Sequence, residues 1–95
     1  MTATSQEQSQ RLIDAGIKQN TADMQYNAVP TKDGPVVELF NGEVTPNGLP
    51  AWSLSALWDA ARTLGIPFVF SDEDTGEDAI RSLVSLIEYK LRHEN

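Results

Sequence analysis

The chain has no cysteine, so disulfide bonds, thiolate metal sites and thiol catalysis are all excluded. It has one histidine, His93, at the end of an expected helix. A fraying helix end supplies neither the partner nor the pocket that a general base needs. Motifs of the common enzyme classes are absent as well: the sequence contains no Gly-x-Ser-x-Gly elbow, no Walker loop and no dinucleotide fingerprint. We therefore predict a protein that is not an enzyme and that carries no cofactor.

Long apolar runs and positive charge are also scarce. No stretch approaches the roughly 18 apolar residues of a membrane span, and residues 1–10 lack the apolar run of a signal peptide. Lysine and arginine number 7 against 14 acidic residues, which gives a net charge of −7. Phosphate backbones repel such a surface. We expect a cytoplasmic protein that binds neither membrane nor nucleic acid, with a protein as its partner, and its composition is also compatible with a homodimer.

Three helices are predicted from capping residues and from apolar spacing. Residues 5–15 follow a Thr4–Glu7 capping box and end at Gly16. Residues 54–64 follow the expected N-cap Ser53 and end at Gly65. Residues 77–92 carry apolar side chains at helical spacing, with acidic residues at the start and basic residues at the end, as the helix dipole favours.

Strands are predicted between these helices. Residues 24–29 alternate apolar and polar side chains, and residues 36–40 form the strongest strand pattern of the chain. Asn41-Gly42 indicates a hairpin turn that would pair Phe40 with Glu43 and Leu39 with Val44. Residues 68–70 resemble a short buried strand, which could instead lie parallel to residues 36–40. The prediction is an α+β fold: three helices packed on a small, mainly antiparallel sheet, in one domain of residues 1–95 with residues 1–4 and 93–95 frayed.

The two tryptophans flank the start of the second helix. Trp58 falls on the apolar stripe and is expected in the core, whereas Trp52 precedes the N-cap, where it suits a hydrophobic staple with Leu57 and is often half exposed. Because tryptophan is enriched at interfaces, Trp52 is our candidate for a partner surface. The full predicted core is Leu39, Phe40, Leu54, Leu57, Trp58, Phe68, Phe70, Leu83, Val84 and Ile87.

An acidic segment at residues 72–78 is the main chemical feature. Its carboxylates could hold a hard divalent cation, with Asp72, Asp74 and Asp78 as candidate ligands, although the calcium-loop pattern fails because Glu77 stands where a glycine is needed. Solvation and helix-dipole complementarity are the preferred explanation of these residues. A metal-binding protein or metal-dependent enzyme is therefore one alternative function, and an acidic mimic of nucleic acid is another.

Three short segments of the sequence are distinctive in combination: EQSQRLI at residues 7–13, NTADM at 20–24 and LPAWSLSAL at 49–57. Together with Asp78-Ala79 they resemble short uncharacterised proteins of gut Bacteroidetes genomes, often found in prophages or mobile elements. Members of that family usually carry a longer segment after the second helix than residues 63–67 here. The resemblance implies a bacterial or phage source and an accessory role, without any functional residue. The leading functional prediction is a non-enzymatic interaction module of a mobile element or phage.

Overall fold

A computed structural model describes residues 3–42, 45–66 and 76–93. Three α-helices and a three-stranded antiparallel sheet make up an α+β fold, as the sequence predicts. The predicted strand at residues 68–70 lies outside the described residues, so its predicted pairing with residues 36–40 stays a prediction. The elements are α1 (Gln6–Ala15), the 3-10 helix η1 (Gln19–Thr21), β1 (Met24–Val29), β2 (Val36–Asn41), β3 (Leu49–Ala51), α2 (Leu54–Thr63) and α3 (Gly76–His93).

Helix α1 uses a different capping residue from the one that the sequence indicated. The backbone N–H of Gln8 donates to Ser5 Oγ at 3.1 Å, and the Gln8 side chain accepts from the Ser5 N–H at 2.8 Å. This is a capping box, but it is displaced by one residue from the Thr4–Glu7 pair. Thr4 does not cap the helix because its hydroxyl lies in a buried network with Ser9 and the backbone of Trp52. The helix ends as predicted at Gly16, whose φ of 102° is left-handed.

Helix α2 begins and ends as predicted. The Ser53 side chain accepts a backbone N–H of the first turn, from Ala56 at 3.2 Å. At the other end Gly65 adopts a φ of 75°, and the N–H of Ile66 folds back on the carbonyl of Ala61 at 2.9 Å. A left-handed glycine with such a returning bond is a common helix stop.

The sheet has the order β2-β1-β3, with β1 in the middle. In the antiparallel β1–β2 pair, Met24 lies opposite Asn41 and Val29 opposite Val36. Strand β3 pairs only with the first half of β1, where Ala51 lies opposite Met24. The sequence predicted β1 and β2 but missed β3, because a three-residue strand containing a proline has no recognisable pattern. The hairpin turn lies at residues 31–34, and the partners expected beyond Asn41-Gly42, Glu43 and Val44, lie outside the described residues.

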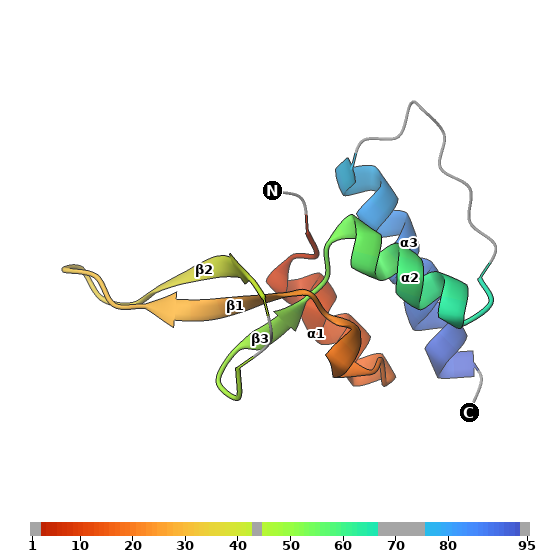
Figure 1. The fold of residues 1–95 in the computed structure, drawn as a ribbon, viewed down its shortest axis with the longest axis horizontal. Helices are drawn as coiled ribbons and strands as arrows, with labels where there is room; N and C mark the ends of the chain where they lie inside the picture. Colours follow the sequence, from red (N-terminus) through yellow and green to blue (C-terminus); the bar gives the residue numbers. More distant parts are fainter. Residues whose placement is uncertain (1–2, 43–44, 67–75, 94–95) are drawn as a thin grey trace.

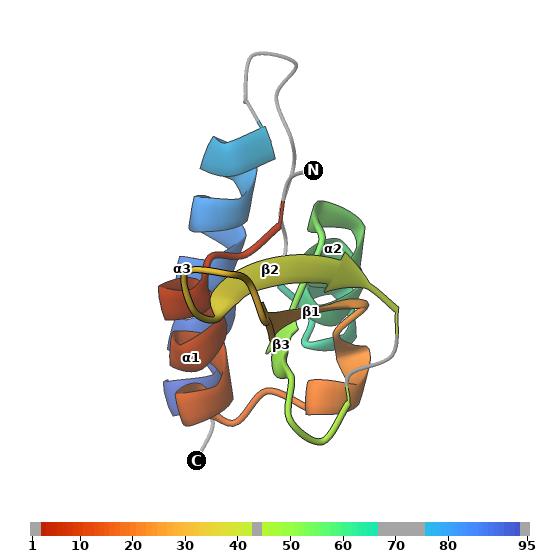
Figure 2. The same cartoon turned by 90° about the vertical axis from the view of Figure 1, so that its left-hand side faces the viewer.

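The molecule divides into two regions (Figures 1 and 2). Helix α3 packs against both α1 and α2, and α1 contacts β3. Strand β2, in contrast, has extensive contacts with β1 alone. We call α1, η1, β3, α2 and α3 the helical body, and residues 24–41 the arm, because the hairpin extends away from the helices in Figure 1.

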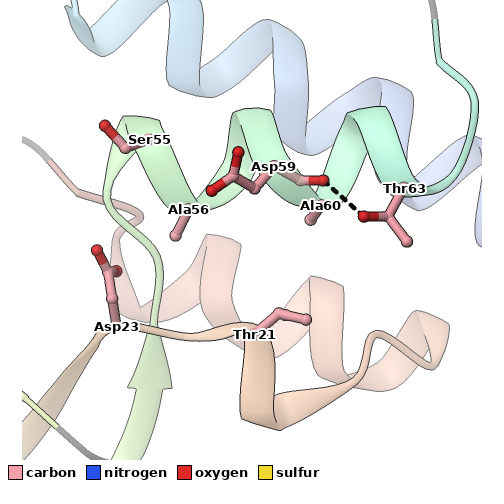
Figure 3. Close-up of a pocket in the computed structure, with 7 residues that line it drawn as sticks. All are labelled: Thr21, Asp23, Ser55, Ala56, Asp59, Ala60 and Thr63. Atoms are coloured by element: carbon pink, nitrogen blue, oxygen red, sulfur yellow. Dashed lines mark hydrogen bonds between the residues drawn. The ribbon is translucent and has the colours of Figure 1, made fainter.

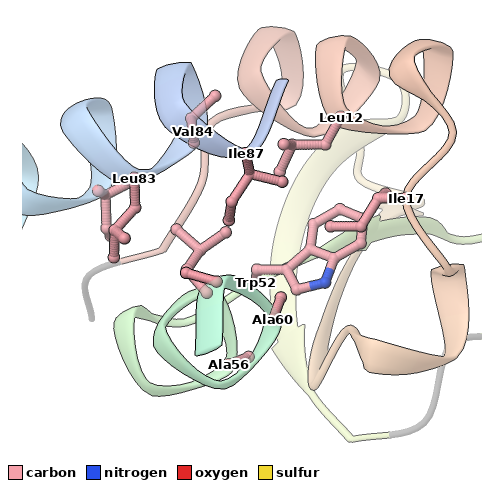
Figure 4. Close-up of a cluster of buried hydrophobic side chains, with 11 residues drawn as sticks. Leu12, Ile17, Trp52, Ala56, Ala60, Leu83, Val84 and Ile87 are labelled. Carbon is pink, nitrogen blue, oxygen red and sulfur yellow. The ribbon is translucent and has the colours of Figure 1, made fainter. Parts of the chain in front are cut away.

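The core lies between the three helices (Figure 4). Four predicted core residues are fully buried there: Leu57, Leu83, Val84 and Ile87. The prediction is wrong for Phe40, which is 40% exposed because it lies on the arm, and Leu39 and Leu54 are only partly buried. Phe68 and Phe70 lie outside the described residues. Sequence pattern alone shows that a strand is apolar, but not whether a core lies beneath it.

The two tryptophans exchange the environments that the sequence assigned to them. Trp52 is 0% exposed, whereas Trp58 is partly buried at the margin of the core. Helix α2 turns its small residues Ala56 and Ala60 inward, and the indole of Trp52 lies between this side of the helix and Ile17 (Figure 4). Small side chains leave the space that a large neighbouring ring fills at core packing density.

A buried polar network ties the first described residues to the body. Thr4 Oγ1 accepts from the Trp52 N–H at 3.0 Å and lies 2.8 Å from Ser9 Oγ, and both hydroxyl-bearing residues are fully buried. Ala3 forms a β-bridge with Ser53. The expected fraying of residues 1–4 is therefore wrong for Ala3 and Thr4.

Candidate functional site

The most distinctive surface of the molecule is strand β2 of the arm. Three large apolar side chains are exposed there: Val36 by 47%, Val37 by 48% and Phe40 by 40%. Because neighbouring residues of a strand point to opposite faces, Val36 and Phe40 lie on one face and Val37 on the other. Apolar side chains thus face solvent on both sides of the hairpin. Their gathering on one strand marks this strand as a candidate interaction surface.

Local sequence determines the shape of the arm. Pro30 and Pro35 stand at the ends of the two strands, where neither is required to donate a ladder hydrogen bond. Between them Thr31 and Gly34 exchange two backbone hydrogen bonds, at 3.1 and 3.2 Å. Gly34 has a φ of 111°, a left-handed value that glycine adopts without strain. These features close a tight turn and hold the two strands in one register.

The base of the arm is fastened to the body by polar contacts. Tyr26 donates its hydroxyl to the Thr4 carbonyl at 2.7 Å, and burial raises the pKa of this phenol. On the other face the buried Gln25 side chain accepts from the N–H and the hydroxyl of Thr45, each at 3.0 Å. Gly48 lets that loop approach closely, since a Cβ there would lie 2.1 Å from Gln25 Oε1. These contacts hold the base of the arm on the body; Val36 and Val37 lie farther out, opposite Val29 and Ala28, whereas Phe40 lies opposite Gln25 at the base.

A groove of about 330 Å³ lies between η1 and α2 (Figure 3). Two carboxylates flank it, and both, like the Thr63 hydroxyl, have partners within the fold. Asp23 accepts from the N–H and the hydroxyl of Ser53 at 2.9 and 2.5 Å. The Thr63 hydroxyl donates to the Asp59 carbonyl at 2.9 Å, and Asp59 itself pairs with Arg62 at 3.9 Å. The groove thus offers no positioned nucleophile with an adjacent base.

Trp52 does not form the partner surface that the sequence suggested. Its ring is fully buried, and its Nε1–H donates to Thr21 Oγ1 at 3.0 Å. The hydroxyl of Thr21 itself donates to the Lys18 carbonyl at 2.6 Å. Trp52 therefore joins η1 to the start of α2, and its role is structural.

The acidic segment is described only from residue 76 onward, so the candidate metal ligands Asp72 and Asp74 lie outside the described residues. The third candidate, Asp78, is exposed in the first turn of α3, and its carboxylate lies 3.4 Å from Arg81 Nη1. Within the described ranges no group of three or more metal-ligating side chains comes together. His93 stacks on Tyr89 at the other end of the helix, with 4.0 Å between ring centroids.

Comparison of the chain with protein-family models, with curated proteins and with solved structures gives no match. The function must therefore be argued from the chain itself. In the described part of the chain, no helix has the combination of length and apolar composition that crossing a membrane requires.

Sequence reasoning predicted the strands of the arm but missed the exposure of their apolar side chains, although one signal for it was present. Val36 and Val37 are adjacent in an expected strand, so they must point to opposite faces. A core on one side of the sheet buries only one of them. A strand that is apolar on both faces, in a chain too short to cover both with helices, indicates exposed apolar surface.

Proposed function

We propose that this protein is a non-enzymatic protein–protein interaction module and that the arm is its binding surface. The observation that carries the proposal is the exposure of Val36, Val37 and Phe40, between 40 and 48%, on strand β2, whose extensive contacts are with β1 alone. A two-stranded hairpin alone is only marginally stable in water. A partner that covers these side chains would stabilise the arm and bind through it.

The polar chemistry of the described residues supports a binding role rather than a catalytic one. The carboxylate of Asp23 is occupied by Ser53, that of Asp78 by Arg81 and that of Glu88 by Arg11. The Arg11 hydrogen bond also lowers the pKa of Glu88. A general base needs a raised pKa near neutrality and a free route to substrate, and this shift is in the opposite direction.

The proposed setting comes from the resemblance to short proteins of gut Bacteroidetes prophages and mobile elements. An accessory protein of such an element acts in the host cytoplasm through host or phage proteins. The net charge of −7 fits such a role by limiting non-specific binding to nucleic acid.

Capture of partners from a bacterial host lysate tests this proposal. Val37→Lys places a charge on the arm, and Leu86→Lys is a matched control, because Leu86 is 39% exposed on α3. We expect partners that the wild type and Leu86→Lys retain and that Val37→Lys loses. Equal retention by both variants would place the interface outside the arm, and the absence of any specific partner would refute the interaction module.

A further inference from the structure

The backbone of β2 has an open hydrogen-bonding edge, and the phase of the hairpin shows which residues form it. Thr31 and Gly34 exchange backbone bonds at one end of the β1–β2 pair, and Gly42 donates to the Asp23 carbonyl at the other, at 3.0 Å. In an antiparallel pair, hydrogen-bonded and non-bonded positions alternate. Given this alternation and the observed register, three residues of β2 direct their N–H and C=O groups toward β1: Val36, Glu38 and Phe40.

The intervening residues of β2 direct their backbone groups away from the sheet. They are Val37, Leu39 and Asn41, and among the described residues they have no hydrogen-bond partner on that side. The outer half of β1 is different. Its corresponding N–H, that of Ala28, is bonded to the Asn27 side chain at 3.1 Å. Within the described residues, the β1 edge of the arm is thus partly blocked at Ala28, and the β2 edge is free.

This free edge lacks the features that usually prevent strand addition. Edge strands are normally protected by lysine, proline, bulges or a covering element. Strand β2 contains one charged residue, Glu38, and it pairs with β1 in continuous register without a bulge. Pro35 stands just before the strand and limits addition at that end only.

We propose that β2 pairs antiparallel with β2 of a second copy of this chain, around a twofold axis at Leu39. This inference rests on the proposed function, since it names the partner of the arm. The pairing forms one continuous sheet from the two copies, in which the arms overlap and the helical bodies lie at opposite ends. A twofold interface uses the same surface on both partners, so each outward N–H and C=O can be satisfied by its counterpart.

Charge and hydrogen bonding favour this register over those shifted toward Pro35. With Leu39 at the axis, Val37 lies opposite Asn41 of the second copy, and Glu38 lies opposite Phe40. A shift that places Glu38 at the axis sets two like charges directly opposite each other, which is destabilising. A further shift brings Pro35 to a bonding position opposite Leu39, where it has no N–H to donate.

Two substitutions of Phe40 test both the partner and the register. Phe40→Lys places a cation opposite Glu38 of the second copy, whereas Phe40→Glu places an anion there. Both remove the same ring, so the loss of its packing is common to the two variants. By sedimentation over a concentration series we expect a dimer in the wild type and Kd values about tenfold weaker for Phe40→Glu than for Phe40→Lys, since cross-strand charge pairs act twice across the axis.

A matched pair on α3 controls for net charge, because Leu86→Lys and Leu86→Glu change the total by the same amounts outside the arm. We expect these two variants to differ little in Kd. We also expect added salt to tighten the wild-type dimer, since each copy carries −7 and screening weakens their repulsion. A larger difference in the Leu86 pair than in the Phe40 pair would move the interface to α3 and overturn the proposal.

Amide exchange gives a second readout that does not depend on substitutions. The amides of Val36, Glu38 and Phe40 are bonded to β1 and should be protected at every concentration. Those of Val37, Leu39 and Asn41 should gain protection only as the dimer forms. A protein that stays monomeric at high concentration overturns this inference while leaving the interaction module intact if Val37→Lys still loses a host partner. A dimer that forms through β2 while no host partner is captured would support this inference and refute the binding of host proteins through the arm.

Discussion

The helical body and the arm bury their apolar residues in different ways. In the body Leu83, Val84 and Ile87 are completely enclosed by side chains from other helices. In the arm Val36 and Val37 have nearly half of their surface in water, although they belong to the strongest strand pattern of the sequence. The body thus buries its apolar side chains within one chain. The two strands of the arm pair through their backbone hydrogen bonds, but apolar side chains of β2 stay exposed. Strand pairing and core burial are separate events, and only the second supplies most of the stability.

The largest expected loss of stability comes from replacing Trp52, which is fully buried in the helical body. Trp52→Ala should lower the free energy of unfolding by about 3–5 kcal/mol, because it removes a fully buried indole and leaves a cavity beside α2. Trp58→Ala is the matched control and should cost clearly less, since Trp58 is only partly buried. Urea unfolding followed by circular dichroism measures both. If Trp52→Ala does not fold, Trp52→Phe should fold with a reduced midpoint. A larger loss for Trp58→Ala would contradict the observed packing.

The second effect tests whether the first residues of the chain belong to the body. Thr4→Val keeps the shape of the side chain but removes the hydroxyl that accepts from the Trp52 N–H. We expect a loss of about 1–3 kcal/mol, because a buried donor is left without a partner. Thr63→Val, at an exposed position of α2, should change stability little. Equal midpoints for the two variants would show that the N-terminal network does not contribute.

A smaller effect comes from the ion pair between α1 and α3. Arg11 donates to Glu88 through Nη2 at 2.8 Å and Nε at 3.3 Å, and this bonding lowers the pKa of Glu88 below its ordinary value of 4.5. Glu88→Gln should cost about 0.2–1 kcal/mol at neutral pH, because the pair is partly exposed. A lowered pKa in the folded state means that the contribution is complete above the unfolded-state pKa and is lost as the pH falls through the folded value.

Unfolding measured from neutral pH down to the pH at which Glu88 is protonated checks this sign. The stability difference between the wild type and Glu88→Gln should shrink as the pH falls. Arg81→Gln, which removes an exposed pair with Asp78 inside α3, is the control and should show a smaller difference throughout. A difference that grows toward acid would contradict the assigned direction of the pKa shift.

The sequence predicted most of the body and both strands of the arm, but not the exposure of the side chains on β2. Helix boundaries followed from Ser53, Gly16 and Gly65, because caps and left-handed glycines act locally. The environments of Trp52 and Phe40 could not be derived in the same way. They depend on which elements lie beside these residues after folding, and periodicity within one element carries no information about its neighbours. Strand β3 was missed for the same reason, since it exists only through its pairing with β1.

The candidate site shows the same limit. Sequence reasoning placed a partner surface at Trp52 because tryptophan is common at interfaces, yet the N-terminal segment covers that residue through Thr4. It placed Phe40 in the core, although this side chain is 40% exposed on strand β2. Exposed apolar side chains could have been expected from the two adjacent valines, but which edge of the hairpin is open depends on the position of β3 and on the bond between Asn27 and Ala28.

The smallest expected effect on stability lies in the arm itself. Val37→Thr keeps a β-branched side chain of similar shape at a position that is 48% exposed. At concentrations where the protein is a monomer, we expect the free energy of unfolding of the helical body to change by less than about 0.5 kcal/mol, as for other surface positions. Circular dichroism of the helices during urea unfolding measures this quantity. Val84→Thr, the same change in the core, should cost much more, because it buries a hydroxyl among apolar side chains. A comparable loss in both variants would mean that the arm packs on the body and folds as part of its core.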